Sequence, residues 1–253
     1  MAIVVLAVAS VLSFPTKGGA QPAPPAGLRA AVLTPDGTDG YELRDTGDRV
    51  TAAARPGNGG GNLRMLFWPS DGRVTADATS CATWSEASSD VVQHGAALRI
   101  GDEPGGSVHA LTVTKNVYVH SYWIFNVHIW DTATGGGTEI ASFDLSPVFR
   151  FGGDLYIARP LPWRLCARTR NGRLEFKAWR LAEIEPPWDD PAHGGSVRLP
   201  ADAPATGAAG WFIGHLRPGM TATFTDLRAH TRIPPSTVPE APVTQDLALT
   251  AGG

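Results

Sequence analysis

The sequence predicts an all-β protein whose short antiparallel strands form a sandwich or a barrel. Its 253 residues include 29 Gly and 21 Pro, a composition that favours many turns over long helices. Short apolar or alternating runs recur along the chain with turn sequences between them, and no stretch has a convincing helical period.

Eleven runs are expected to form strands: 42–52, 63–68, 93–100, 108–114, 118–130, 139–145, 163–169, 173–179, 196–199, 211–216 and 221–231. Asn171-Gly172 lies between two of these runs and is the strongest hairpin signal, because a type I′ turn needs two residues with positive φ. One domain, residues 27–232, is expected to contain all eleven.

The two ends of the chain have different compositions. Residues 1–14 are almost uninterruptedly apolar, and Gly18 and Ala20 offer a cleavage site, so residues 1–20 are expected to be a signal peptide. Residues 21–26 then form an extended leader, and the Pro-rich residues 233–253 form a disordered tail. This predicts a secreted or envelope-associated protein with no stable membrane span after cleavage. No Lys or Arg precedes the apolar run, and an uncleaved single-pass anchor is the alternative.

Charge and cysteine content narrow the function classes. The net charge of −3 argues against a nucleic-acid partner, which would need a basic footprint. Cys81 and Cys166 are the two cysteines, and in an oxidising compartment they are expected to form a disulfide. Two buried free thiols are the alternative.

Residues 117–131 (VYVHSYWIFNVHIWD) carry the strongest functional signal, because the two faces of such a strand differ. The odd positions are apolar and are expected to face the core, among them Val119, Trp123, Phe125, Val127 and Ile129. The even positions are aromatic rings and hydrogen-bonding groups, which would need partners in a dry core but suit a saccharide surface. An ordinary exposed sheet face is the main alternative. A metal site is disfavoured, since His120 and His128 would be about 26 Å apart.

We therefore expect a glycan-binding face, with Arg99 and Trp179 joining it if their strands lie beside this one. The predicted ligand-binding residues are Tyr122, Asn126, His128, Trp130, Arg99 and Trp179.

The sequence resembles concanavalin A-like, laminin-G-like jelly rolls in three features. These are the strand order, residues 173–188 (RLEFKAWRLAEIEPPW) after the Asn-Gly hairpin, and residues 219–230 (GMTATFTDLRAH). The resemblance implies a two-sheet antiparallel jelly-roll β-sandwich with a saccharide-binding face. It also implies that Asp226 can be a ligand of a structural calcium ion, although an Asp near a turn that bonds the backbone is the alternative. No other cofactor is expected.

Catalytic motifs are weak. Glucanases of this fold carry E-x-D-x-x-E on one strand, and residues 139–144 (EIASFD) lack the middle acid. The best catalytic candidates are Asp131, Asp144 and Glu175. The sequence thus favours a non-catalytic, lectin-like carbohydrate-binding protein. The alternatives are a glycoside hydrolase or polysaccharide lyase with an unfamiliar active site, and a structural envelope protein.

Overall fold

The computed structural model describes residues 23–34, 40–55, 61–88, 92–102, 106–118, 123–149 and 162–231. Its elements are fourteen strands and one short helix, α1 (Ser146–Phe149). The predicted signal peptide, the predicted tail and Tyr122 lie outside the described residues. None of the described helices is both long enough and apolar enough to span a membrane.

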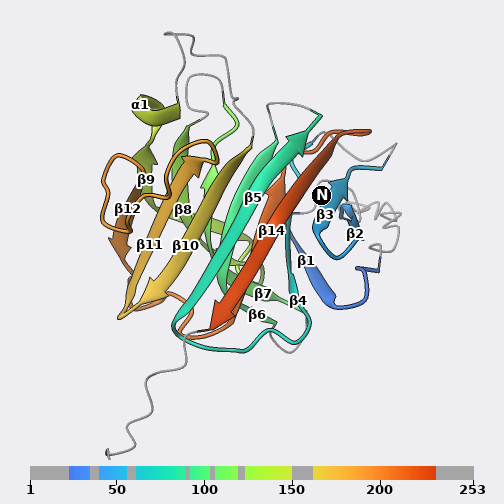
Figure 1. The fold of residues 1–253 in the computed structure, drawn as a ribbon. Helices are drawn as coiled ribbons and strands as arrows, with labels where there is room; N and C mark the ends of the chain where they lie inside the picture. Colours follow the sequence, from blue (N-terminus) through green and yellow to red (C-terminus); the bar gives the residue numbers. More distant parts are fainter. Residues whose placement is uncertain are drawn as a thin grey trace, which may run out of the picture.

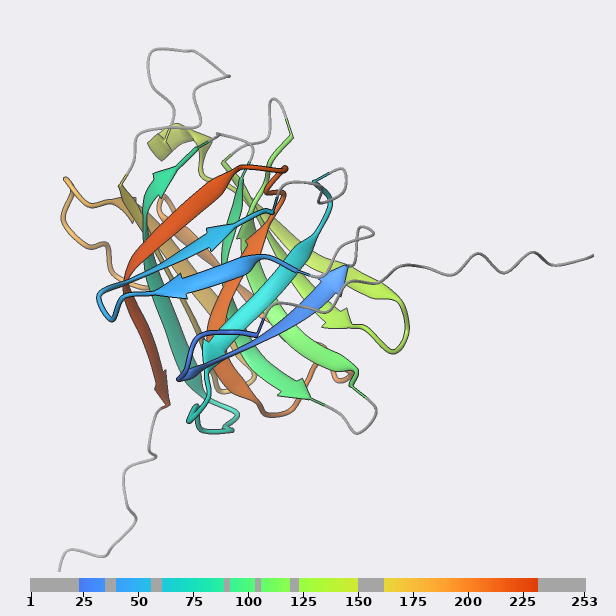
Figure 2. The ribbon, with the colours of Figure 1, turned by 90° about the vertical axis from the view of Figure 1, so that its right-hand side faces the viewer.

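The fourteen strands form two antiparallel sheets of seven that pack face to face, which confirms the predicted two-sheet sandwich (Figures 1 and 2). Sheet A contains, in spatial order, β1 (Leu28–Thr34), β4 (Arg64–Pro69), β13 (Ala208–Gly214), β6 (Gln93–Asp102), β7 (Val108–Lys115), β8 (Ile124–Asp131) and β9 (Gly136–Asp144). Sheet B contains β12 (Gly194–Arg198), β11 (Arg173–Arg180), β10 (Trp163–Arg170), β5 (Ala78–Ala87), β14 (Thr221–Thr231), β3 (Arg49–Ala53) and β2 (Glu42–Asp45).

Two strands, β1 and β5, were not predicted from the sequence. The run 42–52, predicted as one strand, is two strands, β2 and β3, which pair with each other. β5 (ATSCATWSEA) consists largely of Ala, Ser and Thr, and Ala is depleted in strands, so its local pattern is weak. In the structure it lies in the middle of sheet B, between β10 and β14. Tertiary packing, rather than intrinsic propensity, makes it a strand.

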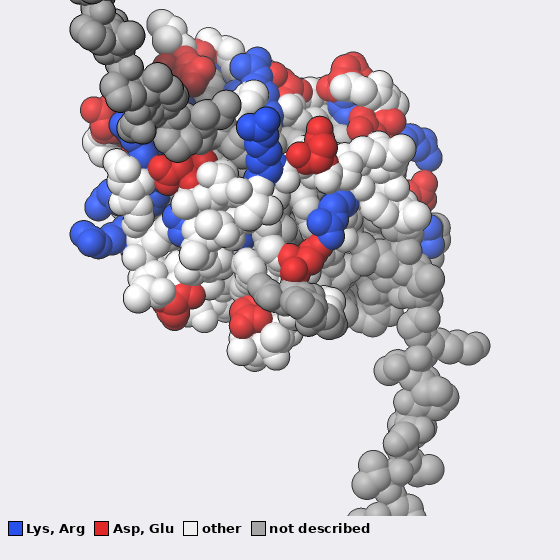
Figure 3. All heavy atoms as spheres, turned by 90° about the horizontal axis from the view of Figure 1, so that it is seen from below, with Lys and Arg blue, Asp and Glu red and all other residues white. Residues whose placement is uncertain are grey.

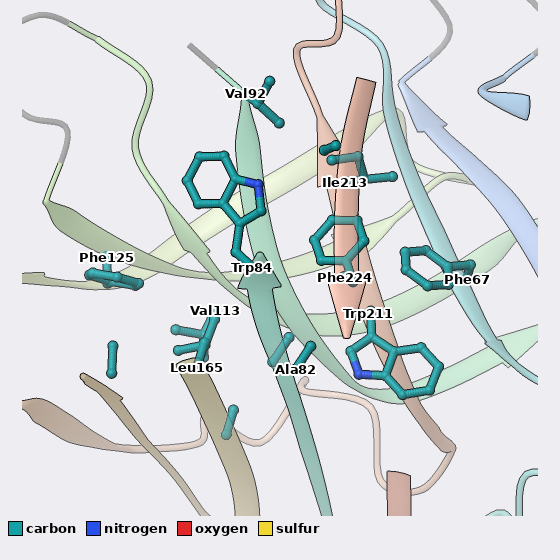
Figure 4. Packing of buried hydrophobic residues seen from close by; sticks show 14 of the residues in the cluster. Phe67, Ala82, Trp84, Val92, Val113, Phe125, Leu165, Trp211, Ile213 and Phe224 are labelled. Atoms are coloured by element: carbon teal, nitrogen blue, oxygen red, sulfur yellow. The ribbon is translucent and has the colours of Figure 1, made fainter. Parts of the chain in front are cut away.

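The space between the sheets is filled by aromatic and aliphatic side chains (Figure 4). Phe125 and Val127 are fully buried there, and Trp123 is 4% exposed, as the odd-position pattern of β8 predicts. Val119 lies outside the described residues. The alternation is therefore confirmed for these residues, while Ile129, also predicted to face the core, is only partly buried and packs against it.

Two local predictions are also confirmed. Asn171 and Gly172 have φ values of 52° and 71° and connect β10 to β11 as a tight hairpin. Cys81 on β5 lies directly opposite Cys166 on β10, and the two form a disulfide that joins positions 85 residues apart.

The core also contains two ionisable side chains, His94 and Lys115. Lys115 is fully buried, and its Nζ donates to the carbonyl of Asn116 at 3.0 Å and lies 5.6 Å from the ring centre of Trp84. The His94 ring packs 4.9 Å from Trp163. Burial, followed by the charge of Lys115, lowers the pKa of His94 to about 3, so this histidine is neutral near pH 7.

Exposed charges of both signs are mixed on the surface, and acidic and basic side chains are interspersed on the face shown in Figure 3. Exposed pairs such as Arg49–Asp48, at 3.5 Å, are screened by solvent and add little to stability. Partly buried ion pairs on the outer faces of the sheets are less screened by solvent than these exposed pairs.

Candidate functional site

A polar pocket of about 350 Å³ opens on the outer face of sheet A, the face turned away from sheet B. Six of the seven strands of sheet A, and segments next to them, contribute the walls. We call it the sheet A pocket, and its lining residues are Thr34, Arg64, Gln93, Thr114, Asn116, Val117, Tyr118, Asn126, His128, Trp130, Gly137, Glu139 and His215.

Strand register brings the lining residues of one half of the pocket together. Arg64 on β4 pairs with Thr34 on one side and with Gly214 on the other, and Gly214 in turn pairs with Gln93. A Cβ on Gly214 would lie 3.1 Å from Oε1 of Gln93 and 3.3 Å from Cγ of Arg64. Because Gly214 has no side chain, Arg64 and Gln93 extend over the strand between them.

The sheet beneath these side chains also contains Gly95, on β6. A Cβ at this position would lie 2.6 Å from the carbonyl oxygen of Val113 and 2.7 Å from Cγ2 of Thr114, so only glycine fits without displacing the backbone. Small residues on the central strands leave room for long side chains from outer strands. The guanidinium carbon of Arg64 on β4 thereby lies 5.9 Å from the ring centre of Trp130 on β8.

Trp130 forms one wall and is itself held in place. Its indole N–H donates to Oγ1 of Thr112 at 2.8 Å, and its ring is 5.5 Å from that of His128. Gly137 on β9 makes room for the indole, since a Cβ there would lie 2.8 Å from the ring. Trp130 is only 5% exposed and belongs to a second apolar cluster on the outer face of sheet A. It is therefore a rigid support more than an open stacking surface.

Two polar atoms in the pocket wall are buried without a hydrogen-bond partner among the described residues, Oε1 of Gln93 and Nδ1 of His128. The amide nitrogen of Gln93 donates to Oγ1 of Thr114 at 3.4 Å. Turning the amide by 180° would exchange which atom meets Thr114 and would still leave one atom unpaired. Each buried polar atom without a partner lowers the stability of the folded state by about 1–3 kcal/mol. A ligand that bonds these atoms would remove that cost.

His128 is uncharged at neutral pH. Burial, followed by the positive charge of Arg64, lowers its pKa to about 4. Its Nε2 lies 3.9 Å from the Glu139 carboxylate, too far for a hydrogen bond. A neutral imidazole offers one donor and one acceptor, which matches a saccharide hydroxyl.

The structure brings together three of the six predicted ligand-binding residues, Asn126, His128 and Trp130. Arg99 lies six residues from Gln93 along β6, about 20 Å by strand rise, and donates to the carbonyls of Ala76 and Pro204 at 3.0 and 2.7 Å. Trp179 lies on sheet B beside the disulfide. Neither joins the sheet A pocket, and Tyr122 lies outside the described residues.

The three candidate acids are far apart. Asp131 caps the β8–β9 turn through the N–H of Ala133, at 2.9 Å. Asp144 accepts from the N–H of Ser146, at 2.8 Å, at the other end of the same pair of strands, about 23 Å away by strand rise. Glu175 pairs with Arg168 on sheet B. They do not form the closely spaced pair that a glycosidase uses.

Asp226 lies at a bulge of β14, with φ of 48°. One carboxylate oxygen accepts from Arg164 and the other from Arg228. Within the described residues, no group of three or more His, Cys, Asp and Glu could hold a metal ion. A carboxylate already bonded to two guanidinium groups does not fit a calcium ligand.

A second, larger cleft of about 870 Å³ lies along the outer face and edge of sheet B, beside Trp188. Its polar groups already bond one another. Arg168 pairs with Glu175 and lies 4.1 Å from the Trp188 ring centre, and Arg173 donates to Ser196 at 2.7 Å. The sheet A pocket has the unpaired groups, so it is the better candidate.

Sequence patterns did not predict Arg64, Gln93, Thr114 or Glu139 as site residues. Arg64 opens an apolar strand, and Gln93 precedes an Ala- and Gly-rich one, so neither has a local signal. Their proximity depends on β13, which is distant in sequence and pairs with both β4 and β6.

No family model and no curated protein matches the sequence. Solved structures do match. A protein of unknown function with a galectin-like fold from Bacillus subtilis has a TM-score of 0.50 at 10% identity, over 80% of this chain and 88% of that one. At this identity the match shows the fold alone.

Two other matches have TM-scores just below 0.5. The carbohydrate-binding module CBM66 from Bacillus subtilis has a TM-score of 0.48 at 11% identity, over 80% of this chain and 95% of that one. The exoplasmic/lumenal domain of VIP36, in a form bound to Ca²⁺ and Man3GlcNAc, has a TM-score of 0.49 at 13% identity, over 85% of this chain and 90% of that one.

Proposed function

We propose that this protein is a carbohydrate-binding protein and that the sheet A pocket is its saccharide site. The proposal rests on two buried polar atoms in the wall of this polar pocket, Oε1 of Gln93 and Nδ1 of His128. Neither atom has a hydrogen-bond partner among the described residues. Sugars present many hydroxyls, each a donor and an acceptor, and can satisfy such groups. The volume, about 350 Å³, suits a small number of sugar units.

The rigid surroundings support the same function. Trp130 is held by Thr112 and Gly137, and Gln93 by Thr114, so few side chains need to be ordered when a ligand binds. Preorganisation of this kind lowers the entropic cost of binding. The affinity is still expected to be micromolar to millimolar, because hydroxyl groups must be desolvated first.

A glycan array followed by titration calorimetry tests the proposal. Asn126→Ala and Gln93→Ala should each weaken binding of the best glycan without unfolding the protein. Ser196→Ala is the matched control, because Ser196 lines the second cleft on sheet B. The assignment would be contradicted if no glycan on the array binds. It would also be contradicted if Ser196→Ala abolishes binding and Asn126→Ala does not.

We propose further that the protein works outside the cytoplasm. The Cys81–Cys166 disulfide supports this, since disulfides persist in oxidising compartments and are rare in the cytosol. Cell fractionation with an antibody against the full chain should recover it in the envelope or the medium. Recovery from the cytosol with two alkylatable thiols would overturn the proposal.

A further inference from the structure

The guanidinium of Arg64 is bonded only weakly within the described part of the chain. Its two hydrogen bonds both leave from Nη1 and go to neutral acceptors, Oγ1 of Thr34 at 3.3 Å and the carbonyl of Asn62 at 3.4 Å. Both are long. No acidic side chain of the described residues lies within ion-pair distance of its guanidinium, which is partly buried beside Trp130. Burial lowers the pKa of Arg64, and a guanidinium nevertheless stays protonated.

Other partly buried arginines are satisfied differently. Arg164 pairs with Asp226 and Arg168 with Glu175. Arg99 forms no ion pair among the residues that the structure describes but donates to two carbonyls, at 3.0 and 2.7 Å. Of these four arginines, Arg64 is the one that lines a pocket with only long hydrogen bonds to neutral acceptors and no ion pair among the described residues.

The acid in the same pocket lies on the far side of two rings. The contacts run from Arg64 to Trp130 at 5.9 Å, from Trp130 to His128 at 5.5 Å, and from His128 to Glu139 at 3.9 Å. The pocket therefore has a cationic end and an end that carries a neutral imidazole and a carboxylate. An anion fits the first end, and hydroxyl groups fit the second.

We infer that the ligand is an anionic saccharide whose carboxylate or sulfate group pairs with Arg64, an inference that rests on the proposed saccharide site. The planar guanidinium fork matches the two oxygens of a carboxylate and, equally, two oxygens of a sulfate ester. The hydroxyls of the same sugar or its neighbour bond Gln93, Asn126 and His128. Attraction in this partly desolvated pocket is stronger than the same pair would have in water.

Titration calorimetry with matched oligosaccharides tests the inference. The carboxylate arm compares trigalacturonate with its carboxyl-reduced, neutral counterpart, and the sulfate arm compares a κ-carrageenan tetrasaccharide with its desulfated counterpart. In at least one arm the anionic sugar should bind at least tenfold more tightly than the neutral one. That preference should shrink as the NaCl concentration rises. The arm that shows the preference identifies the anionic group.

Variants then assign the preference to Arg64. Arg64→Gln should reduce the affinity for the anionic sugar to that of the neutral one, and Arg64→Lys should keep part of the difference. Arg173→Gln is the control, because Arg173 is an exposed arginine on sheet B that lines the second cleft. Circular dichroism and thermal unfolding establish that each variant is folded.

The outcomes separate the two proposals. Equal affinity for anionic and neutral sugars in both arms overturns the anionic ligand and leaves the saccharide site standing. A preference that survives Arg64→Gln also overturns it, and its loss with Arg173→Gln would place the anionic group in the sheet B cleft. If no saccharide of either kind binds, here or on the array, the proposed function and this inference both fail.

Discussion

The outer faces of the two sheets carry similar residue types that are paired in different ways. On sheet B the charges close on one another: Arg164 with Asp226, Arg168 with Glu175, and Lys177 with Glu185 at 2.7 Å. On sheet A, Arg64 has only long bonds to neutral acceptors, and Gln93 and His128 each have an unpaired atom among the described residues.

This difference in pairing predicts that the outer face of sheet B contributes to stability and that of sheet A to ligand binding. A paired group on sheet B lowers the free energy of the folded state, and removing one partner leaves the other unsatisfied. An unpaired group on sheet A gives the folded state little or costs it free energy, and gains a partner only when a ligand arrives. Substitutions on sheet B should therefore change stability without changing affinity. Substitutions in the sheet A pocket should, at neutral pH, change affinity more than stability.

The largest expected effect is on the pH dependence of stability. In the unfolded chain His94 and His128 titrate near pH 6.5, whereas in the folded protein their pKa values are lowered to about 3 and about 4. As the pH falls from about 6.5 to about 4, the unfolded state takes up protons that the folded state does not, so stability is lost with falling pH. At about 1.4 kcal/mol per pKa unit, each histidine costs on the order of 3 kcal/mol by pH 4.

Urea unfolding across this pH range measures the loss. His94→Phe should remove the contribution of His94 to the pH dependence of stability. His128→Phe should remove the contribution of His128 and should also weaken ligand binding. A slope that neither substitution reduces would contradict the assignment to these two side chains.

The disulfide on sheet B gives the next largest effect. The double substitution Cys81→Ala, Cys166→Ala should lower the free energy of unfolding by about 2–5 kcal/mol, because the bond closes a long loop in the unfolded chain. Denaturant unfolding gives the value, with the reduced parent as a control. Glycan affinity, measured under conditions where the variant is folded, should be unchanged. A loss of affinity in the folded variant would break the separation between the two faces.

A smaller change is expected for Glu175→Gln, which breaks the pair with Arg168. Both side chains are about one-fifth exposed, so solvent screens part of the attraction, and stability should fall by about 1 kcal/mol. Titration with the glycan should give the parent's affinity. If affinity falls instead and stability does not, the sheet B cleft rather than the sheet A pocket binds the sugar.

The smallest effect is expected for Gln93→Met in the pocket. Affinity should fall by about 0.5–1.5 kcal/mol, the net contribution of a neutral hydrogen bond. The free energy of unfolding should stay the same or rise slightly, because an unpaired buried amide atom is removed. Calorimetry and urea unfolding of the same sample measure both quantities. A clear loss of stability would show that Gln93 is structural.

Local features of this protein could be predicted from the sequence because they depend on neighbours along the chain. The alternation of β8 places Phe125 and Val127 inside and Asn126 and His128 outside, since side chains of a strand point to opposite faces in turn. The Asn171-Gly172 hairpin follows from backbone sterics at two residues. The disulfide is not local, but it could be predicted because the sequence has two cysteines and predicts an oxidising compartment.

Only the tertiary structure decided which strands lie side by side. β13 comes late in the chain and pairs with β4 and β6, and this non-local pairing brings Arg64 next to Gln93. Trp179 has the residue type expected of a sugar site but lies on the other sheet. The alternation of a strand fixes the face of each residue and contains no information about its neighbour across the sheet. Packing over the whole core determines that neighbour, and the residues that line the pocket together could therefore not be predicted from the sequence.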